Sequence, residues 1–348
     1  MSNETEPAPA AHGQPTLKAI ADAVGVHVST VSRALKRDPE SPDASKSVRR
    51  IHRIAEQMGY RPNLMAAGLR TNRSYTIGVV MPRLTDVVIA QTCEAIEEAA
   101  TAAGYQILLA TPPDEVNAQL QSIQMLASRR IDGLIVSSIH LDRPDMVEEI
   151  LRAGIPTIAV NRRADGKLHA VTTDDYHGGY LAGEHLVNLG HRRIGIVAGP
   201  RHASTAWDRT QGCIEAITSR GIEVDEELIV HTDFEVQGGI SGAHRLLNLS
   251  DPPTAIFAVN DTAAIGVAGA VRDRGLSIPR DISLVGYNDI PLVSQLPVPF
   301  TTISSPAAPM GSVALQQLLR GINEGEMSSL KLPVSLIVRA STTVPRHN

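Results

Sequence analysis

The sequence predicts an α/β protein with an N-terminal helix-turn-helix headpiece, a hinge helix, and a two-lobed domain of doubly wound parallel sheets. Residues 16–60 show helical spacing of apolar residues, interrupted by a glycine-bearing turn. From Thr76 onward, short apolar strands alternate with helices that several times end at glycine. These β-α units are more numerous than one open sheet usually holds, so we expect two lobes.

The headpiece begins with two short helices. Leu17, Ile20 and Ala21 share one face of the first helix, and Gly25 is expected to end it in a left-handed conformation. The second helix has an apolar face formed by Val28, Val31, Ala34 and Leu35. Its opposite face carries hydrogen-bond donors suited to phosphates and base edges, namely Ser29, Thr30, Ser32 and Arg33.

A third helix is expected to start near Ser41 to Ser45, with Asp43 or Ser45 as its N-cap, and to end at Gly59. Its outward cations fit a solvated face and a DNA-facing surface equally well. Residues 61–72 form a linker that keeps apolar residues where a simple spacer would be polar. This pattern favours a short helix that folds against bound DNA.

Charge and composition point the same way. Residues 16–75 contain eleven Lys/Arg and five Asp/Glu, whereas residues 76–348 contain 21 and 30. The balance of +6 against −9 is typical of a nucleic-acid-binding headpiece on an acidic body, although chance clustering is the alternative. Cys93 and Cys213 lie far apart in sequence and are predicted to be buried free thiols, without a disulfide framework or metal-ligand spacing.

The expected localisation is cytoplasmic. The first fifteen residues lack the basic and apolar segments of a signal peptide and are expected to be a disordered tail. No apolar run approaches the ~18 residues of a membrane span.

In the two-lobed domain the expected strands are 77–81, 106–110, 134–136, 157–160, 194–197, 228–231, 255–259 and 283–285. The expected helices are 92–103, 117–129, 145–153, 178–189, 209–220, 238–247 and 262–274.

With these motifs in place, the chain resembles the lactose-repressor (LacI/GalR) family of transcriptional regulators from Thr16 to about Val344. The matching stretches include TLKAIADAVGV, STVSRAL, GYRPN, IDGLIV, GIPTIAVNR, GHRRIGIVAG, PTAIFAVNDTAAIG and PRDISLVGYND. The resemblance implies a periplasmic-binding-protein-like core and a homodimer without a cofactor. The implied parts are a tail (1–15), a headpiece (16–60), a hinge (61–75) and an effector domain (76–348), whose lobes are about 76–173 with 305–325 and 174–304 with 326–344.

The resemblance also implies the residues that contact a double-stranded DNA operator. Arg33 would bridge O6 and N7 of a guanine, and Val28 would meet a thymine methyl. Leu69 would be a minor-groove wedge, while Gly68 weakens the hinge helix so that it orders only on cognate DNA. Histidine is a poor N-cap, so the His27 ring is assigned a phosphate contact. The full implied set is His27, Val28, Ser29, Thr30, Ser32, Arg33, Asn63, Leu69 and Arg70.

The implied effector-binding residues are Ile89, Asn161, Arg209, Phe234, Asn260 and Asn288. Amides, a guanidinium and an aromatic face suit a polyhydroxyl ligand. Arg83 is a further candidate for the cleft, and Trp207 is expected either to line the cleft or to pack between the lobes. Asp174, Asp261 and Asp289 would assist binding or, as we favour, serve as caps and strand ends.

The sequence therefore predicts a ligand-responsive repressor of carbohydrate-utilisation genes, released from a palindromic operator by a sugar or sugar derivative. The alternatives are a corepressor-dependent regulator of the same family and a sugar-binding protein without a DNA role. An enzyme is not expected, because the dinucleotide-binding, Walker A, nucleophile-elbow and zincin motifs are absent from the sequence.

Overall fold

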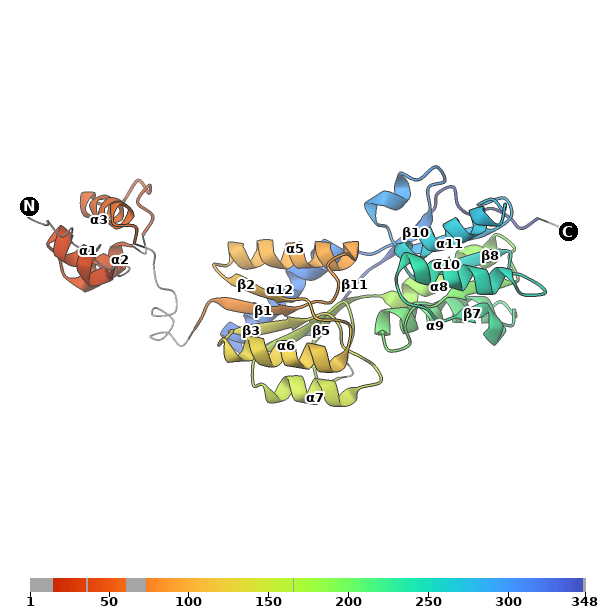
Figure 1. Ribbon diagram of the computed structural model, residues 1–348, viewed down its shortest axis with the longest axis horizontal. Helices are drawn as coiled ribbons and strands as arrows, with labels where there is room; N and C mark the ends of the chain where they lie inside the picture. The colour runs from red at the N-terminus through yellow and green to blue at the C-terminus, as the bar shows by residue number, and fades with distance from the viewer. Residues whose placement is uncertain (1–14, 36, 61–72, 165, 347–348) are drawn as a thin grey trace, which may run out of the picture. The chain divides into compact units, whose positions relative to one another are not determined.

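The computed structural model describes residues 15–35, 37–60, 73–164 and 166–346 (Figure 1). The chain divides into a small unit, residues 1–72, and a large unit, residues 73–348. We describe each unit by itself. The predicted contacts of Asn63, Leu69 and Arg70, and the predicted hinge helix, lie outside the described residues.

The small unit contains the helices α1 (Leu17–Val24), α2 (Val28–Ala34) and α3 (Lys46–Gln57). Ile20, Val31 and Ile51 are fully buried, one from each helix, and form the centre of its core. Gly25 adopts the left-handed conformation expected of a helix end, with φ of 76°. Ser45 caps α3 by accepting the Val48 N–H at 3.3 Å, which selects between the two predicted caps.

The large unit contains two six-stranded sheets. The first sheet has the order β11 (Leu330–Leu332), β5 (Ala170–Thr173), β4 (Thr157–Val160), β3 (Gly133–Val136), β1 (Thr76–Val80) and β2 (Gln106–Ala110). The second has the order β12 (Ser335–Ile337), β10 (Thr301–Ser304), β9 (Ser283–Asn288), β8 (Ala255–Ala258), β6 (Ile194–Val197) and β7 (Ile229–Val230). Among the described strands, only β10 and β12 pair antiparallel.

Helices cover both faces of each sheet, as Figure 1 shows for the first. One face of the first sheet is covered by α5 (Val87–Ala102) and α12 (Ala307–Glu324), and the other face by α6 (Val116–Ser128) and α7 (Pro144–Arg152). One face of the second sheet is covered by α8 (Asp175–Asn188) and α9 (Ser204–Thr218), and the other face by α10 (Val236–Leu247) and α11 (Asp261–Asp273). Two short 3-10 helices, η1 (Glu226–Leu228) and η2 (Pro291–Ser294), lie in loops of the second lobe.

The chain passes between the lobes after β5, after β10 and after β11. The third passage corrects the predicted lobe composition, which assigned all of 326–344 to the second lobe. The strand β11 instead pairs with β5 of the first sheet, with Leu330 opposite Val171. Such a short edge strand carries little hydrophobic pattern, so its partner sheet was not readable from the sequence.

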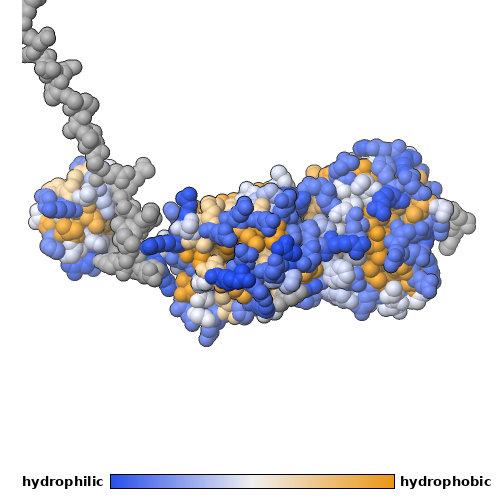
Figure 2. Space-filling view, turned by 60° about the horizontal axis from the view of Figure 1, so that its bottom comes forward, coloured by the Kyte–Doolittle hydropathy of each residue, from blue (hydrophilic) through white to orange (hydrophobic). Residues whose placement is uncertain are grey.

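Two helices begin five residues earlier than predicted. The helix α5 starts at Val87 because Asp86 caps it, accepting the Val88 N–H at 2.9 Å. The helix α9 starts at Ser204, so Arg209 lies inside the helix and not at its start. Both predicted free cysteines are buried and unpaired. In the described part, no helix is long and apolar enough to cross a bilayer, and hydrophilic areas dominate the face drawn in Figure 2.

Candidate functional site

The exposed side of α2 begins at His27, which is the N-cap of the helix. The Ser29 N–H donates to Nδ1 of the His27 ring at 3.2 Å, and the Ser29 hydroxyl lies 2.8 Å from the same nitrogen. The expectation that histidine caps this helix poorly was therefore wrong. Because Nδ1 acts as the acceptor, the neutral ring carries its hydrogen on Nε2. The capping geometry thus leaves an N–H donor on an exposed side chain.

Arg33 is exposed one turn further along α2. Its Nε donates to the Ser29 carbonyl at 3.3 Å, which directs the guanidinium back along the helix. Ser29 is exposed as well, whereas Val28, Thr30 and Ser32 are half-buried. This side of α2 therefore presents a guanidinium, a hydroxyl and an imidazole, which are donors for phosphates and base edges.

The helix α3 shows that part of the cationic surface is structural. Arg49 donates from Nε to the Pro39 carbonyl at 3.3 Å and from Nη2 to the Ser41 carbonyl at 3.5 Å. His52 Nε2 lies 3.1 Å from the Ala34 carbonyl at the end of α2. These contacts fix the loop between α2 and α3 and hold α3 against the C-terminal end of α2.

A second candidate site is a cleft between the two lobes of the large unit. It lies beyond the carboxyl ends of strands from both sheets, where ligands bind in open α/β folds. All six predicted effector-binding residues line it. The complete lining is Pro82, Arg83, Asp86, Val88, Ile89, Ser137, Asn161, Arg162, Thr205, Arg209, Phe234, Asn260 and Asn288.

Three cleft residues hold the left-handed backbone conformation that is uncommon outside glycine. Arg83 has φ of 52°, Asn161 of 69° and Asn288 of 110°. Asn tolerates this conformation better than most residues because its short polar side chain can bond locally. Backbone strain of this kind gathers at ligand-binding sites, where the surrounding fold maintains it.

Arg209 is buried in the cleft wall and already has partners. Its Nε donates to Oδ1 of Asp175 at 2.7 Å and its Nη1 donates to the Val259 carbonyl at 2.8 Å. The guanidinium also stacks on the Tyr287 ring, 3.7 Å from the ring centroid. Burial alone would lower the pKa of Arg209, but the Asp175 carboxylate raises it above the ordinary value. Arg209 is therefore a charged, fixed part of the wall.

Asn260 also serves the fold directly. Its Oδ1 accepts the Ala263 N–H at 3.0 Å, which caps α11, and its Nδ2 donates to the Phe234 carbonyl at 2.9 Å. Other polar atoms of the cleft lack such partners. The hydroxyl of Ser137 and Oδ1 of Asn288 are buried without a hydrogen-bond partner among the described residues. A buried unpaired polar atom is costly, so both atoms are suited to meet a ligand.

Sequence reasoning missed several lining residues, of which Ser137 is the most informative. Ser137 follows β3 directly, just as Asn161 follows β4. The position of polar residues at strand ends could therefore have identified Ser137. Thr205 and Arg162 gave no comparable signal, because Thr205 lies in the first turn of α9 and Arg162 is two residues beyond the end of β4.

The structure also shows where the secondary candidates lie. Arg83 lines the cleft and bonds Glu235, which links the two lobes. Trp207 is 43% exposed and lines a separate cavity of about 300 Å³ beside α9, not the cleft.

The three candidate aspartates each have structural partners. Asp174 caps α8, Asp261 accepts hydrogen bonds from Thr302 and Ile290, and Asp289 pairs with Arg339. These contacts fit the favoured structural interpretation of all three carboxylates.

Comparisons with known proteins match the chain in both units. Residues 74–340 match the family model for periplasmic binding proteins and the sugar binding domain of the LacI family, and residues 16–63 match the model for bacterial regulatory proteins of the lacI family. The HTH-type transcriptional repressor PurR of Photobacterium profundum is 28% identical over 330 residues, covering 94% of this chain and 98% of PurR.

Two solved structures extend this similarity to the fold. The lac repressor dimer bound to operator and the anti-inducer ONPF matches with a TM-score of 0.85 and 26% identity, over 95% of this chain and 100% of that one. The complex of the transcriptional regulator CelR with cellobiose matches with a TM-score of 0.72 and 28% identity, over 94% of this chain and 100% of that one.

Proposed function

Because the chain belongs to the LacI family of bacterial regulatory proteins, we propose that a neutral sugar or sugar derivative binds its interlobe cleft and releases it from a palindromic operator. DNA-binding regulation of transcription, not catalysis, is the activity of this family and of this chain. In the proposal the chain acts as a homodimer that represses carbohydrate-utilisation genes. In the described headpiece its proposed DNA contacts are His27 at the N-cap of α2 and, within the helix, Val28, Ser29, Thr30, Ser32 and Arg33.

The charge balance of the cleft supports a neutral ligand. Each of its three arginines has a carboxylate partner: Arg83 pairs with Glu235, Arg162 with Asp114 and Arg209 with Asp175. A free anion would have to compete with these carboxylates.

The observation that carries the proposal is that two buried atoms of one cavity, the Ser137 hydroxyl and Oδ1 of Asn288, have no hydrogen-bond partner in the part of the chain that the structure describes. A hydroxyl that donates and accepts can satisfy both. Phe234 lines the same cavity, and its aromatic ring suits the CH surface of a sugar.

The small volume of the cleft supports a change of lobe position that accompanies ligand binding. Its free volume is about 40 Å³, whereas pockets for small molecules usually measure roughly 300–1,000 Å³. A sugar therefore enters only when the lobes or the lining side chains move apart. A ligand that prefers one lobe arrangement shifts the population toward it, and DNA affinity changes if the headpieces respond.

The test combines DNA binding with a ligand screen on the full-length protein. Operator candidates are selected from a random duplex library and measured by fluorescence anisotropy. Sugars, sugar acids and nucleosides are then screened by thermal shift, because a ligand that binds the native state raises its apparent stability. We expect a neutral sugar or sugar derivative to raise the midpoint of unfolding and to weaken operator binding.

Ser137→Ala tests the cleft itself. This change removes an unpartnered hydroxyl without breaking a described hydrogen bond, so folding and operator binding should persist while the thermal shift shrinks. Ser312→Ala in α12 is the matched control, because that exposed hydroxyl bonds its own helix. An equal ligand-induced shift in both variants would place the effector elsewhere. Failure to bind any selected duplex would contradict the headpiece assignment instead.

A further inference from the structure

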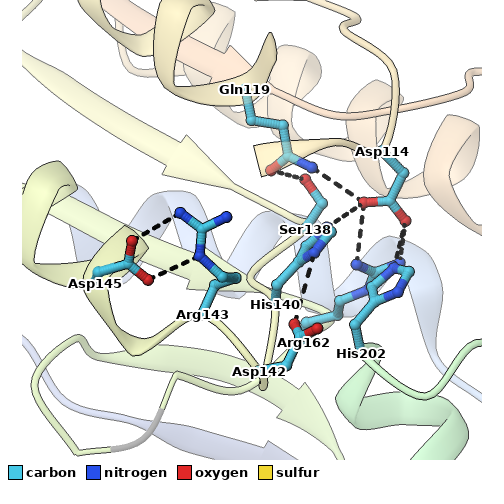
Figure 3. A network of polar contacts seen from close by, with 9 residues as sticks. All are labelled: Asp114, Gln119, Ser138, His140, Asp142, Arg143, Asp145, Arg162 and His202. Atoms are coloured by element: carbon cyan, nitrogen blue, oxygen red, sulfur yellow. Dashed lines mark hydrogen bonds and ion pairs between the residues drawn. The ribbon is translucent and has the colours of Figure 1, made fainter. Parts of the chain in front are cut away.

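Outside the effector proposal, one polar cluster joins three loops from both lobes (Figure 3). In the first lobe, Asp114 lies between β2 and α6, and His140 lies after β3. His202 lies between β6 and α9 in the second lobe. The backbone links two of these loops across the lobes, since the Leu141 N–H donates to the His202 carbonyl at 2.9 Å. The three side chains therefore meet across the lobe boundary.

Both imidazoles direct the same ring nitrogen at one carboxylate. His140 Nε2 lies 2.9 Å from Oδ1 of Asp114, and His202 Nε2 lies 3.4 Å from Oδ2. The two rings stack, with centroids 4.1 Å apart and planes at 17°. One ligand atom from each of the three residues lies within 4.8 Å of the others.

We propose that Asp114, His140 and His202 bind a divalent transition-metal ion, for which Zn²⁺ fits best. Imidazole nitrogen and carboxylate oxygen are its usual ligands, at roughly 2.0–2.2 Å in tetrahedral geometry. Ligand atoms of such a tetrahedron are about 3.3 Å apart. His140 Nε2 lies 2.9 Å from Oδ1 and His202 Nε2 lies 3.4 Å from Oδ2, which is close to this value for a carboxylate that offers both of its oxygens to the ion. Water would complete the coordination.

The hydrogen-bond inventory of Asp114 argues that the cluster is more than a network of hydrogen bonds. Arg162 donates two N–H groups to the carboxylate, at 2.7 and 3.2 Å, and Gln119 donates a third at 3.0 Å. If both histidines also donated, five donors would compete for the roughly four lone-pair sites of one carboxylate. At least one imidazole nitrogen is better used as a lone-pair donor to a metal ion.

The surroundings can orient the three ligands. Oδ1 of Asp142 lies 4.0 Å from His140 Nδ1, so a small movement lets Nδ1–H donate to that carboxylate while Nε2 holds the metal. Gln119, which bonds Asp114, is itself fixed by the Ser138 hydroxyl at 2.7 Å. Figure 3 shows these groups around the three ligands.

The Arg162 guanidinium opposes a cation at this cluster. Its charge lowers metal affinity, but it also keeps Asp114 ionised. Burial alone would raise the pKa of Asp114, whereas the hydrogen bonds from His140 and His202 and the charge of Arg162 hold it well below its usual range. The carboxylate is therefore ionised, which is the form that can bind a cation.

The test is a titration of Zn²⁺ into tag-free, chelator-treated full-length protein by isothermal calorimetry. We expect one ion per chain. His140→Gln and His202→Gln should each weaken binding by more than the ~10–100-fold that loss of an outer partner costs. His177→Gln is the matched control, because His177 is exposed on α8 away from the cluster. Co²⁺ should give the visible absorption of a tetrahedral nitrogen and oxygen site.

Two results would overturn the proposal. One is the absence of stoichiometric Zn²⁺ binding and of the Co²⁺ absorption in the wild-type chain. The other is equal Zn²⁺ affinity in His140→Gln, His202→Gln and the His177→Gln control. Circular dichroism of each variant establishes that it is folded, and the Co²⁺ measurement on the unaltered chain does not depend on any variant.

Discussion

Asp261 provides a quantitative test of how the second lobe is built. The side chain is fully buried beneath the start of α11, where Oδ1 accepts the Thr302 hydroxyl at 2.7 Å and Oδ2 accepts the Ile290 N–H at 2.9 Å. Among the described residues no cation pairs with it. Burial raises its pKa from 3.8 to about 7, against the opposing effect of these two hydrogen bonds.

The sign of the effect on stability follows from proton binding. Between pH 3.8 and about 7 the folded state holds the Asp261 proton more tightly than the unfolded state does. The contribution of this group to stability is therefore complete below pH 3.8 and is lost as the pH rises through about 7. A difference of about 3 pKa units corresponds to about 4 kcal/mol, as an order of magnitude.

Asp261→Asn isolates this contribution, because the amide resembles the neutral carboxyl at every pH. We expect its free energy of unfolding to lack the fall of about 1.4 kcal/mol per pH unit that one proton gives between about pH 4.5 and 6.5. Urea unfolding followed by the fluorescence of Trp207, the single tryptophan, measures it within the same lobe. Asp273→Asn, at the exposed end of the same helix, is the control. A pH dependence of Asp261→Asn that matches wild type would refute the reasoning.

Two further predictions address the headpiece and the packing of the second lobe. Arg33→Ala should reduce discrimination between the selected operator and an unrelated duplex by about 1–3 kcal/mol, measured by competition anisotropy; an unchanged ratio would remove Arg33 from base reading. Gly212→Ala should lower the midpoint of urea unfolding, because its Cβ would lie 1.9 Å from the Tyr176 carbonyl oxygen. Gly269→Ala is the control, because its Cβ would meet nothing within 4 Å, and the change should stabilise α11 by about 0.5–1 kcal/mol. Equal effects of the two changes would contradict the described packing of Gly212.

The sequence was most informative where local physics decides the structure. Apolar spacing and the Gly25 turn predicted the three headpiece helices, because these features act within a few residues. Eight of the described strands were predicted from short apolar runs, whereas β5 and β10, which also lie inside their sheets, were missed. Strand β11 was not assigned to its sheet, because the partner of an edge strand depends on contacts distant in sequence.

The same distinction holds for the candidate sites. Asn161 and Asn288 were predicted as cleft residues from the family resemblance, and both stand at the ends of buried strands. The hydrogen-bond and ion-pair partners that these cleft side chains already have within the protein could not be predicted from the sequence. The side-chain amide of Asn260 caps α11 and bonds the Phe234 carbonyl, and the charged Arg209 forms an ion pair with Asp175. These roles arise from packing between helices and sheets.

The two proposed sites are physically connected through Arg162. This residue lines the effector cleft and at the same time donates two hydrogen bonds to Asp114. A ligand hydroxyl that draws the guanidinium into the cleft would leave Asp114 with fewer donors and strengthen it as a metal ligand. An ion that bridges His140 and His202 would in turn favour the lobe arrangement in which it binds. Linkage then requires each ligand to change the affinity of the other by the same factor.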